Sequence, residues 1–389
     1  MNVPLVRPDL GEAEIEAVTR VVRSGWVTQG PEVAAFEREF AAAVGAAHAV
    51  AVSNCTVALE LALRLVGVAA GDEVVTVSHS FIATANAIVA AGARPVFVDV
   101  EADTLGMDPQ ALEDSLPPQT KAILCVHQLG IPCDIDAILR VARARGLPVI
   151  EDAACAVGSA VLRDGRRERL GRPHGDLACF SFHPRKVVTT GDGGMITTSD
   201  AEVADRLRRL RQHAMSVPDT VRHTSTRVVF EEYTEPAYNY RMTDLQAALG
   251  RPQIARLDAI VAERTRLAET YAAALAEHPV LRAPQPRPNA RWNWQTYAAF
   301  LRDGARLGQV EVLQFLLDRG IACKRGVSNA HQEPAYADRS RWRAGPGGLR
   351  VSERLRDGVV MLPLYHGMTP AEQEAVIAAL RELAERGRS

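Results

Sequence analysis

Short apolar segments alternate with segments of helical pattern from residue 47 to residue 182. The first two pairs are 47–53 with 55–67 and 72–78 with 81–92, and further apolar runs follow at 94–100, 121–128, 147–153 and 177–182. Nearly continuous runs of Val, Ile and Ala with helices between them are typical of a parallel sheet covered on both faces. The alternation therefore predicts an α/β domain with a mostly parallel central sheet.

The length of 389 residues indicates two domains. A helical pattern covers residues 243–278, in which Pro252 is predicted to kink or restart the helix, and a Pro-rich stretch follows at 279–294. We expect a large domain over residues 1–248. A smaller α+β C-terminal domain, including the connecting helix, is expected over residues 249–389.

The overall composition favours small-molecule chemistry. Hydrophobic residues make up 47% of the chain, charged residues 24%, and the formal net charge is −2. Because the chain has no long block of charges of one sign, we expect neither nucleic acid nor a membrane as a partner. No secretory segment or long apolar run is evident, so we expect a cytoplasmic protein. The six cysteines form no CxxC pair, and no metal site is expected.

Polar and aromatic groups stand where predicted strands end, which is where such sheets bind ligands. Ser, Asn and Thr in residues 53–56 either cap a helix or bind a phosphate. Glu151 and Asp152 end a very apolar strand. They serve in a cap or salt bridge, or one of them pairs with a cationic ring nitrogen. Phe81 either fills the core or stacks on a cofactor ring.

Lys186 lies in a loop between two predicted strands, in the segment "FSFHPRKVVTTGDGGM" at residues 180–195. Taken alone, such a lysine is usually solvated. The functional alternative is an amine that forms a reversible imine, which arginine cannot do.

Taken in order, these segments resemble the DegT/StrS-type sugar aminotransferases, a branch of the aspartate-aminotransferase-like enzymes of fold type I that use pyridoxal phosphate (PLP). The motifs that carry the resemblance span nearly the whole chain and include "SGWVTQGPEVAAFEREFA", "SNCTVALELAL", "VIEDAA", "FSFHPRKVVTTGDGGM", "YNYRMTDLQAALG" and "LPLYHGMT". The resemblance implies a large PLP-binding domain and a smaller C-terminal one.

The resemblance also implies roles for individual residues. Lys186 would hold the cofactor as a Schiff base and move the proton during transfer. Asp152 would keep the pyridine nitrogen protonated, and Phe81 would stack on the ring. The other cofactor-binding positions that it implies are Thr56, Val57, Cys155, Ser181, His183 and Asn239. Asn239 would reach the cofactor of a neighbouring subunit, so the resemblance implies a homodimer with shared active sites.

For the substrates, the resemblance implies an amino-acid donor, glutamate before glutamine, and a keto-sugar acceptor, first of all a nucleotide-linked one. Thr28 would lie on the substrate side. Where relatives carry Gln or His this chain has Cys155, and the usual substrate loop is replaced by residues 323–336. In that loop Arg325 and His331 are candidates for contacting a substrate anion or hydroxyl.

Three other functions remain open from the sequence: transfer to a cyclitol or other polyol ketone, sugar dehydration, and PLP binding by a regulator without turnover. Dehydratases of this family replace the lysine with histidine, so Lys186 favours transamination over dehydration.

Overall fold

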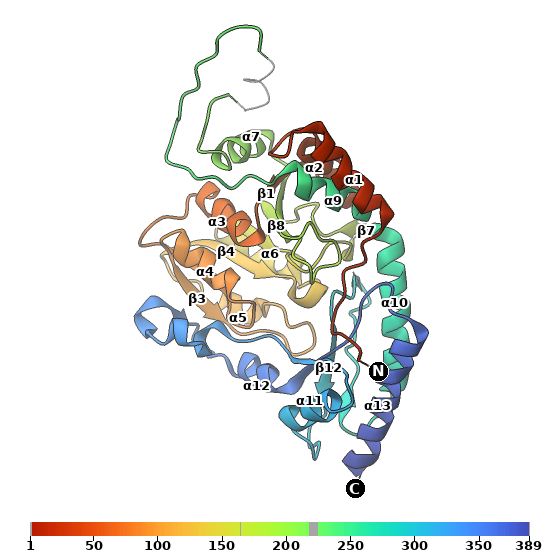
Figure 1. The fold of residues 1–389 in the computed structure, drawn as a ribbon. Coiled ribbons are helices and arrows are strands. Elements are labelled where there is room, and N and C mark those ends of the chain that lie inside the picture. Colours follow the sequence, from red (N-terminus) through yellow and green to blue (C-terminus); the bar gives the residue numbers. More distant parts are fainter. Residues whose placement is uncertain (1, 164, 218–224, 389) are drawn as a thin grey trace.

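The computed structural model describes residues 2–163, 165–217 and 225–388. Its centre is an eight-stranded sheet in the order β1-β9-β8-β5-β4-β2-β3-β14 (Figure 1). These strands are β1 (His48–Val52), β2 (Glu73–Val77), β3 (Arg94–Val98), β4 (Thr120–Val126), β5 (Val149–Asp152), β8 (Leu177–Ser181), β9 (Gly194–Thr198) and β14 (Arg343–Ala344). Only β9 pairs antiparallel with its neighbours among the described pairs, so the expectation of a mostly parallel sheet is confirmed.

Helices bury both faces of this sheet. On one face, Val74 and Ile150 pack with α3 and α7; on the other, Val75 and Phe180 pack toward α6, α2 and α9. Burial on both sides explains why the strands are apolar without alternation. The helices of this part are α1 (Glu12–Ser24), α2 (Pro31–Val44), α3 (Cys55–Leu65), α4 (Ala83–Ala90), α5 (Pro109–Glu113), α6 (Ile135–Ala144), α7 (Ala201–Leu210) and α9 (Asp244–Ala255).

The chain then enters α10 and a second, antiparallel sheet in the order β10-β12-β15-β13. Its elements are α10 (Leu257–Ala274), β10 (Leu281–Arg282), β12 (Tyr297–Leu301), α11 (Gln309–Leu317), β13 (Lys324–Arg325), α12 (Arg350–Gly358), β15 (Val359–Leu362) and α13 (Pro370–Arg388). A third, small sheet joins β6 (Ala160–Arg163), β7 (Arg166–Arg169) and β11 (Ala290–Arg291). Short 3-10 turns lie at Gln128–Gly130, Ala330–Gln332, Pro334–Tyr336 and Arg339–Arg341.

The helical break predicted at Pro252 falls instead at Arg256, between α9 and α10. Pro252 removes one backbone donor, but the neighbouring Gln253 amide donates to the carbonyls of Leu249 and Thr189, at 2.7 and 2.8 Å. The helix continues past the proline to Ala255.

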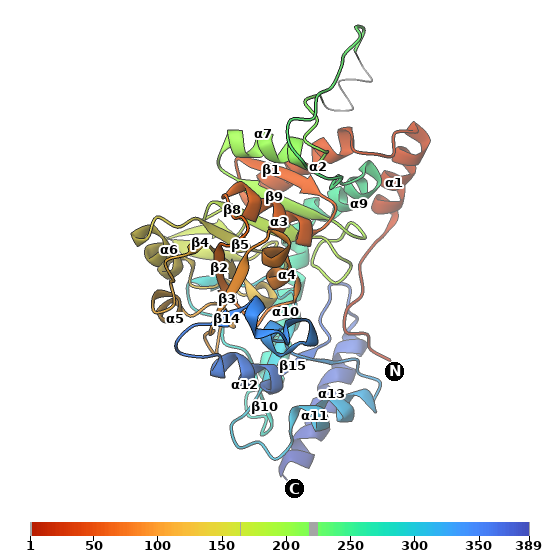
Figure 2. The same ribbon diagram turned by 90° about the vertical axis from the view of Figure 1, so that its left-hand side faces the viewer.

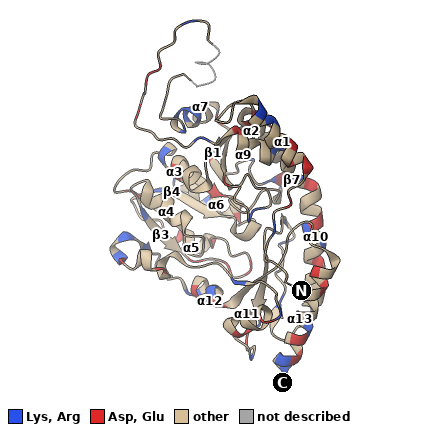
Figure 3. Cartoon of the chain, viewed as in Figure 1, with Lys and Arg blue, Asp and Glu red and all other residues tan. Residues whose placement is uncertain are grey.

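Residues 234–242 pack on the body and end at the buried Met242, whereas residues 225–233 before them form an arm that stands away from the body in both views (Figures 1 and 2). It carries exposed apolar side chains, with Val228 84% and Phe230 86% exposed. Elsewhere the charges of opposite sign are interspersed, as along α10 and α13 (Figure 3). Within the described part of the chain, the helices are too short or too polar to cross a bilayer.

Candidate active site

A cavity of about 510 Å³ lies beyond the carboxyl ends of the central strands and is closed on its far side by the C-terminal sheet. Loops that follow strands of the central sheet line it together with residues of β13 and β15. The residues proposed from the sequence that line this cavity are Thr56, Phe81, Asp152, Cys155, Ser181, His183 and Lys186. The site therefore forms where an α/β sheet is expected to bind its ligand.

Asp152 ends β5 and presents its carboxylate to the cavity while remaining only 5% exposed. One oxygen accepts a hydrogen bond from the Thr84 hydroxyl at 2.8 Å, and the other accepts from the Ala154 N–H at 3.1 Å. Burial raises the pKa of Asp152 despite these two bonds and the charge of Lys186. A cationic group entering the cavity would stabilise this carboxylate.

Glu151 points the opposite way, because successive side chains of a strand alternate between faces. It accepts hydrogen bonds from His127 Nε2 at 2.9 Å and from the N–H groups of His174 and Gly175 at 2.7 and 2.8 Å. Burial opposes its charge, but the bonds from His127 and His174 hold its pKa well below the usual range. Of the two adjacent carboxylates, only Asp152 is available to a ligand in the cavity.

Lys186 faces the same cavity, and its Nζ lies 3.0 Å from Cys155 Sγ. Burial disfavours its ammonium form, but Cys155, Cys55 and Asp152 outweigh burial and raise the pKa of Lys186 above its ordinary value. The amine is therefore enclosed beside a thiol and near a carboxylate, which is not the setting of a solvated turn lysine.

Gln295 holds the backbone on both sides of Lys186. Its Oε1 accepts from the Val187 N–H at 2.9 Å, and its Nε2 donates to the Arg185 carbonyl. Gln295 is 7% exposed and lines the cavity. The two bonds hold the loop that presents the lysine, and the bond to the Val187 N–H is buried.

Two further polar residues hold Gln295. Asn293 Oδ1 accepts from the Gln295 N–H at 2.8 Å, and its Nδ2 donates to the Cys155 carbonyl at 2.7 Å. Arg264 on α10 is 1% exposed and donates to the carbonyls of Trp294 and Gln295 at 2.9 and 2.8 Å. Trp294 has a φ of 53°, a left-handed conformation that costs about 1–3 kcal/mol. The sequence analysis predicted no role for Gln295, Asn293 or Arg264.

The N-terminus of α3 reaches the cavity. Asn54 caps the helix by accepting from the Val57 N–H at 3.0 Å. Val57 does not line the cavity, and its N–H is already bonded. Gly194 is required beside this turn, because a Cβ there would lie 2.5 Å from the Asn54 carbonyl carbon. The hydroxyls of Thr56 and Ser181 are the groups best placed for an anion at this helix end.

The structure does not bring five predicted residues into this cavity: Val57, Thr28, Asn239, Arg325 and His331. Asn239 is exposed at the base of the arm. The Arg325 guanidinium lies 3.8 Å from Glu333. His331 is held outside the cavity by the Ser78 hydroxyl at 2.6 Å and by Glu353 at 3.2 Å.

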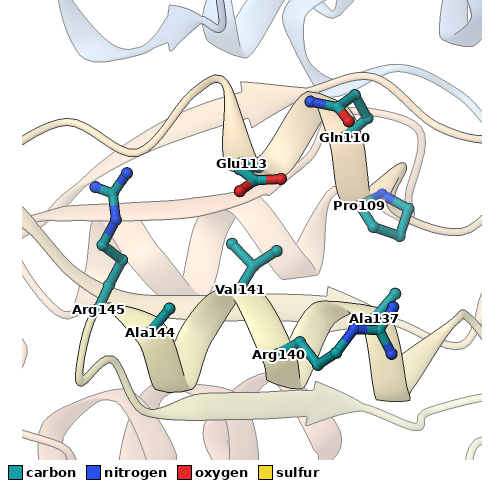
Figure 4. Close-up of a pocket in the computed structure, with 8 residues that line it drawn as sticks. All are labelled: Pro109, Gln110, Glu113, Ala137, Arg140, Val141, Ala144 and Arg145. Atoms are coloured by element: carbon teal, nitrogen blue, oxygen red, sulfur yellow. The ribbon is translucent and has the colours of Figure 1, made fainter.

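A second hollow, of about 320 Å³, lies between α5 and α6 (Figure 4). Its rim carries Glu113, Arg140 and Arg145, and Val141 lies in the middle of it. None of the residues predicted for the site lines it. We therefore assign the chemistry to the larger cavity.

The fold and the half-buried Lys186 amine facing the same cavity as the buried Asp152 carboxylate define an enzyme of the aminotransferase class, fold type I. The DegT/DnrJ/EryC1/StrS aminotransferase family model matches residues 8–381, and the chain belongs to this family. It is 39% identical to the spore coat polysaccharide biosynthesis protein SpsC of Bacillus subtilis over 98% of this chain and 97% of that protein.

Two solved structures are also similar. The aminotransferase TlmJ of Streptoalloteichus hindustanus is 36% identical, with 98% of this chain and 99% of that chain covered and a TM-score of 0.87. The PLP-form structure of Spr1654 from Streptococcus pneumoniae is 26% identical, with 99% of each chain covered and a TM-score of 0.89.

Proposed function

We propose that this aminotransferase uses PLP to move an amino group from glutamate, or from glutamine, to a keto-sugar, first of all a nucleotide-linked one, in amino-sugar biosynthesis. The observation that carries the proposal is that Lys186 and Asp152 line one cavity, close enough for their charges to interact. The name of SpsC supports a route to polysaccharide, and the PLP form of Spr1654 supports the cofactor.

The groups around the cavity suit PLP chemically. Asp152 would keep a ring nitrogen protonated, and Phe81, 73% exposed on the cavity wall, would stack on the ring. Thr56 and Ser181 would hold the phosphate at the start of α3. Bound PLP supplies an electron sink for the charge left when a substrate C–H proton is removed.

Lys186 would then act as the base and acid of the reaction. Its Nζ would take the proton from the donor's α-carbon and, in the second half-reaction, deliver a proton to the former keto carbon of the sugar. The amine is partly buried, and the bonds from Gln295 hold the backbone on both sides of the lysine. His183 and Cys155 line the same wall and would contact the cofactor.

We also propose a homodimer in which Asn239 completes the partner's cofactor site. Asn239 does not line the cavity of its own chain and is exposed at the base of an arm with exposed Val228 and Phe230. An arm with apolar side chains on the outside is better stabilised against another chain than in water. Thr28, outside the cavity of its own chain, would belong to the same shared region.

The proposed function is tested by visible absorbance of the protein with PLP, before and after addition of glutamate or glutamine. We expect the donor to change the spectrum of the wild-type protein, and the Lys186→Ala variant to make this change at least about 10³-fold more slowly. Circular dichroism controls for folding. An unchanged rate in the folded variant would remove Lys186 from the mechanism, and a wild-type protein that does not bind PLP would overturn the proposal.

A further inference from the structure

Two cations from different parts of the fold line the cavity. Arg185 comes from the loop that carries Lys186, and Lys324 comes from β13 in the C-terminal sheet. Both side chains are exposed. Neither forms an ion pair within the ranges that the structure describes, whereas Arg325, next to Lys324, faces Glu333 at 3.8 Å.

The charges around these two residues are predominantly positive. Partial burial, Arg185 and Arg325 all lower the pKa of Lys324, so the cations lie close enough to repel one another. Two carboxylates line the cavity, Asp152 and Asp192. Asp152 is buried and bonded to Thr84, so it does not neutralise an exposed guanidinium. An anion entering between the two cations would relieve their repulsion.

We propose that Arg185 and Lys324 together bind the diphosphate of a nucleotide-linked keto-sugar; this inference rests on the proposed function. The reacting carbon must lie beside Lys186, and the sugar ring separates this carbon from the diphosphate. A phosphate group therefore belongs on exposed cations at the cavity wall. The α-carboxylate of the amino donor is bonded directly to the reacting carbon and belongs deeper in the cavity.

The two side chains suit a diphosphate in complementary ways. The planar guanidinium of Arg185 can donate two parallel hydrogen bonds to phosphate oxygens, and the ammonium of Lys324 acts as a compact charge. Because they come from different elements, a diphosphate between them would also link the loop of Lys186 to the C-terminal sheet. This pair replaces Arg325 and His331, the anion contacts that the sequence predicts.

The test uses the PLP-bound protein and the variants Arg185→Gln, Lys324→Gln and the double variant. Arg325→Gln is the matched control, since it removes the adjacent cation of the same strand, which faces Glu333. Binding of UDP and dTDP is measured by calorimetry at two salt concentrations. We expect each single change to weaken binding of the preferred nucleotide about tenfold and the double change about a hundredfold, with less salt dependence. The control should bind like the wild type.

The two half-reactions separate this inference from the proposed function. If the variants slow the spectral change with glutamate but bind nucleoside diphosphates normally, the cations serve the donor's carboxylate and the inference is wrong. Unchanged nucleotide binding and unchanged donor rates in the double variant would also overturn it. Failure of the wild-type protein to react with either donor would count against the proposed function instead, whatever the nucleotide measurements show.

Discussion

Lys186 Nζ lies 3.0 Å from Cys155 Sγ, and both atoms belong to side chains that line one cavity. Cys155 is half-buried, whereas Cys55 and Cys179 beside it are buried. The thiol is therefore a hydrogen-bond partner of the amine that we place at the centre of the reaction, and it raises the pKa of that amine.

Replacement of Cys155 by alanine is predicted to lower the pKa of Lys186 in the cofactor-free protein. Burial already lowers this pKa, and Cys155 is the strongest of the groups that raise it. Without the thiol, more of the amine is neutral at a given pH, and neutral amine captures the aldehyde of PLP. The rate of PLP capture, measured against pH, should rise at lower pH in the variant.

Cys323→Ala is the control for this experiment, because Cys323 is also half-buried but does not line the cavity. The dependence of its PLP-capture rate on pH should match that of the wild type. A Cys155→Ala profile that stays in place, or moves to higher pH, would show that the thiol does not stabilise the ammonium.

Gln295→Leu is predicted to impair the presentation of Lys186. The change removes the acceptor of the Val187 N–H and the donor to the Arg185 carbonyl. Leaving the buried Val187 N–H without a partner costs about 1–3 kcal/mol. We expect a lower melting temperature, a lower kcat with little change in KM for the donor, and a shifted absorbance of bound PLP.

Gln295→Glu separates the two bonds, since a carboxylate keeps the acceptor for Val187 but loses the donor to Arg185. It should recover part of the lost kcat. If Gln295→Leu lowers the melting temperature but leaves kcat and the spectrum unchanged, the residue supports the fold and does not position the lysine.

Asp152→Asn is predicted to stabilise the cofactor-free protein at neutral pH. The folded-state pKa of Asp152 is raised above its ordinary value of 3.8, chiefly by burial. Folding thus favours the protonated form of Asp152. The stability that this protonation contributes is fully present below the ordinary pKa, and it is lost as the pH rises through the folded-state pKa. Removing the charge should raise the melting temperature by a few degrees at pH 7.5, with a smaller gain toward pH 4.

Bound PLP should remove the stability advantage that Asp152→Asn has over the wild type without cofactor. PLP is expected to raise the melting temperature of the wild type more than that of Asp152→Asn, because only the carboxylate pairs with a protonated ring nitrogen. Asp192→Asn, at an exposed carboxylate of the same cavity, is the control. Equal stabilisation of wild type and Asp152→Asn by PLP would contradict the assigned role.

The residues that the sequence could indicate are those tied to strand ends. Asp152 and Lys186 follow apolar runs that could only be buried strands, and parallel strands bring their carboxyl ends to one edge. The order of the strands along the chain and the resemblance of the motifs were enough to predict that Asp152 and Lys186 share one site. The α/β class followed from the same pattern.

The supporting residues could not be predicted in this way. Gln295 reaches Val187 across 108 positions, and Arg264 looks like one more surface charge of a charge-rich helix. Arg325 and Lys324 are adjacent, and only the direction of a two-residue strand decides which of them lines the cavity. Such details depend on tertiary packing, for which the sequence carries no local signal.

The proposed sharing of sites between subunits predicts complementation between two defective variants. Lys186→Ala lacks the reactive amine, and Asn239→Ala lacks the group that we assign to the partner's cofactor. In a mixed dimer, one site has both defects and the other has neither. Random reassortment of equal amounts makes about half of the dimers mixed, so activity should return to about one quarter of the wild-type value.

The two variants are unfolded together, refolded and assayed for amine transfer, and each is also refolded alone as a control. Activity of the mixture that equals the average of the two separate controls would exclude a shared site. Asn239→Gln keeps an amide on a longer side chain, so partial activity there, with none in Asn239→Ala, would indicate that the amide itself is required. Recovery in the mixture alone would also explain why Asn239 lies outside the cavity of its own chain.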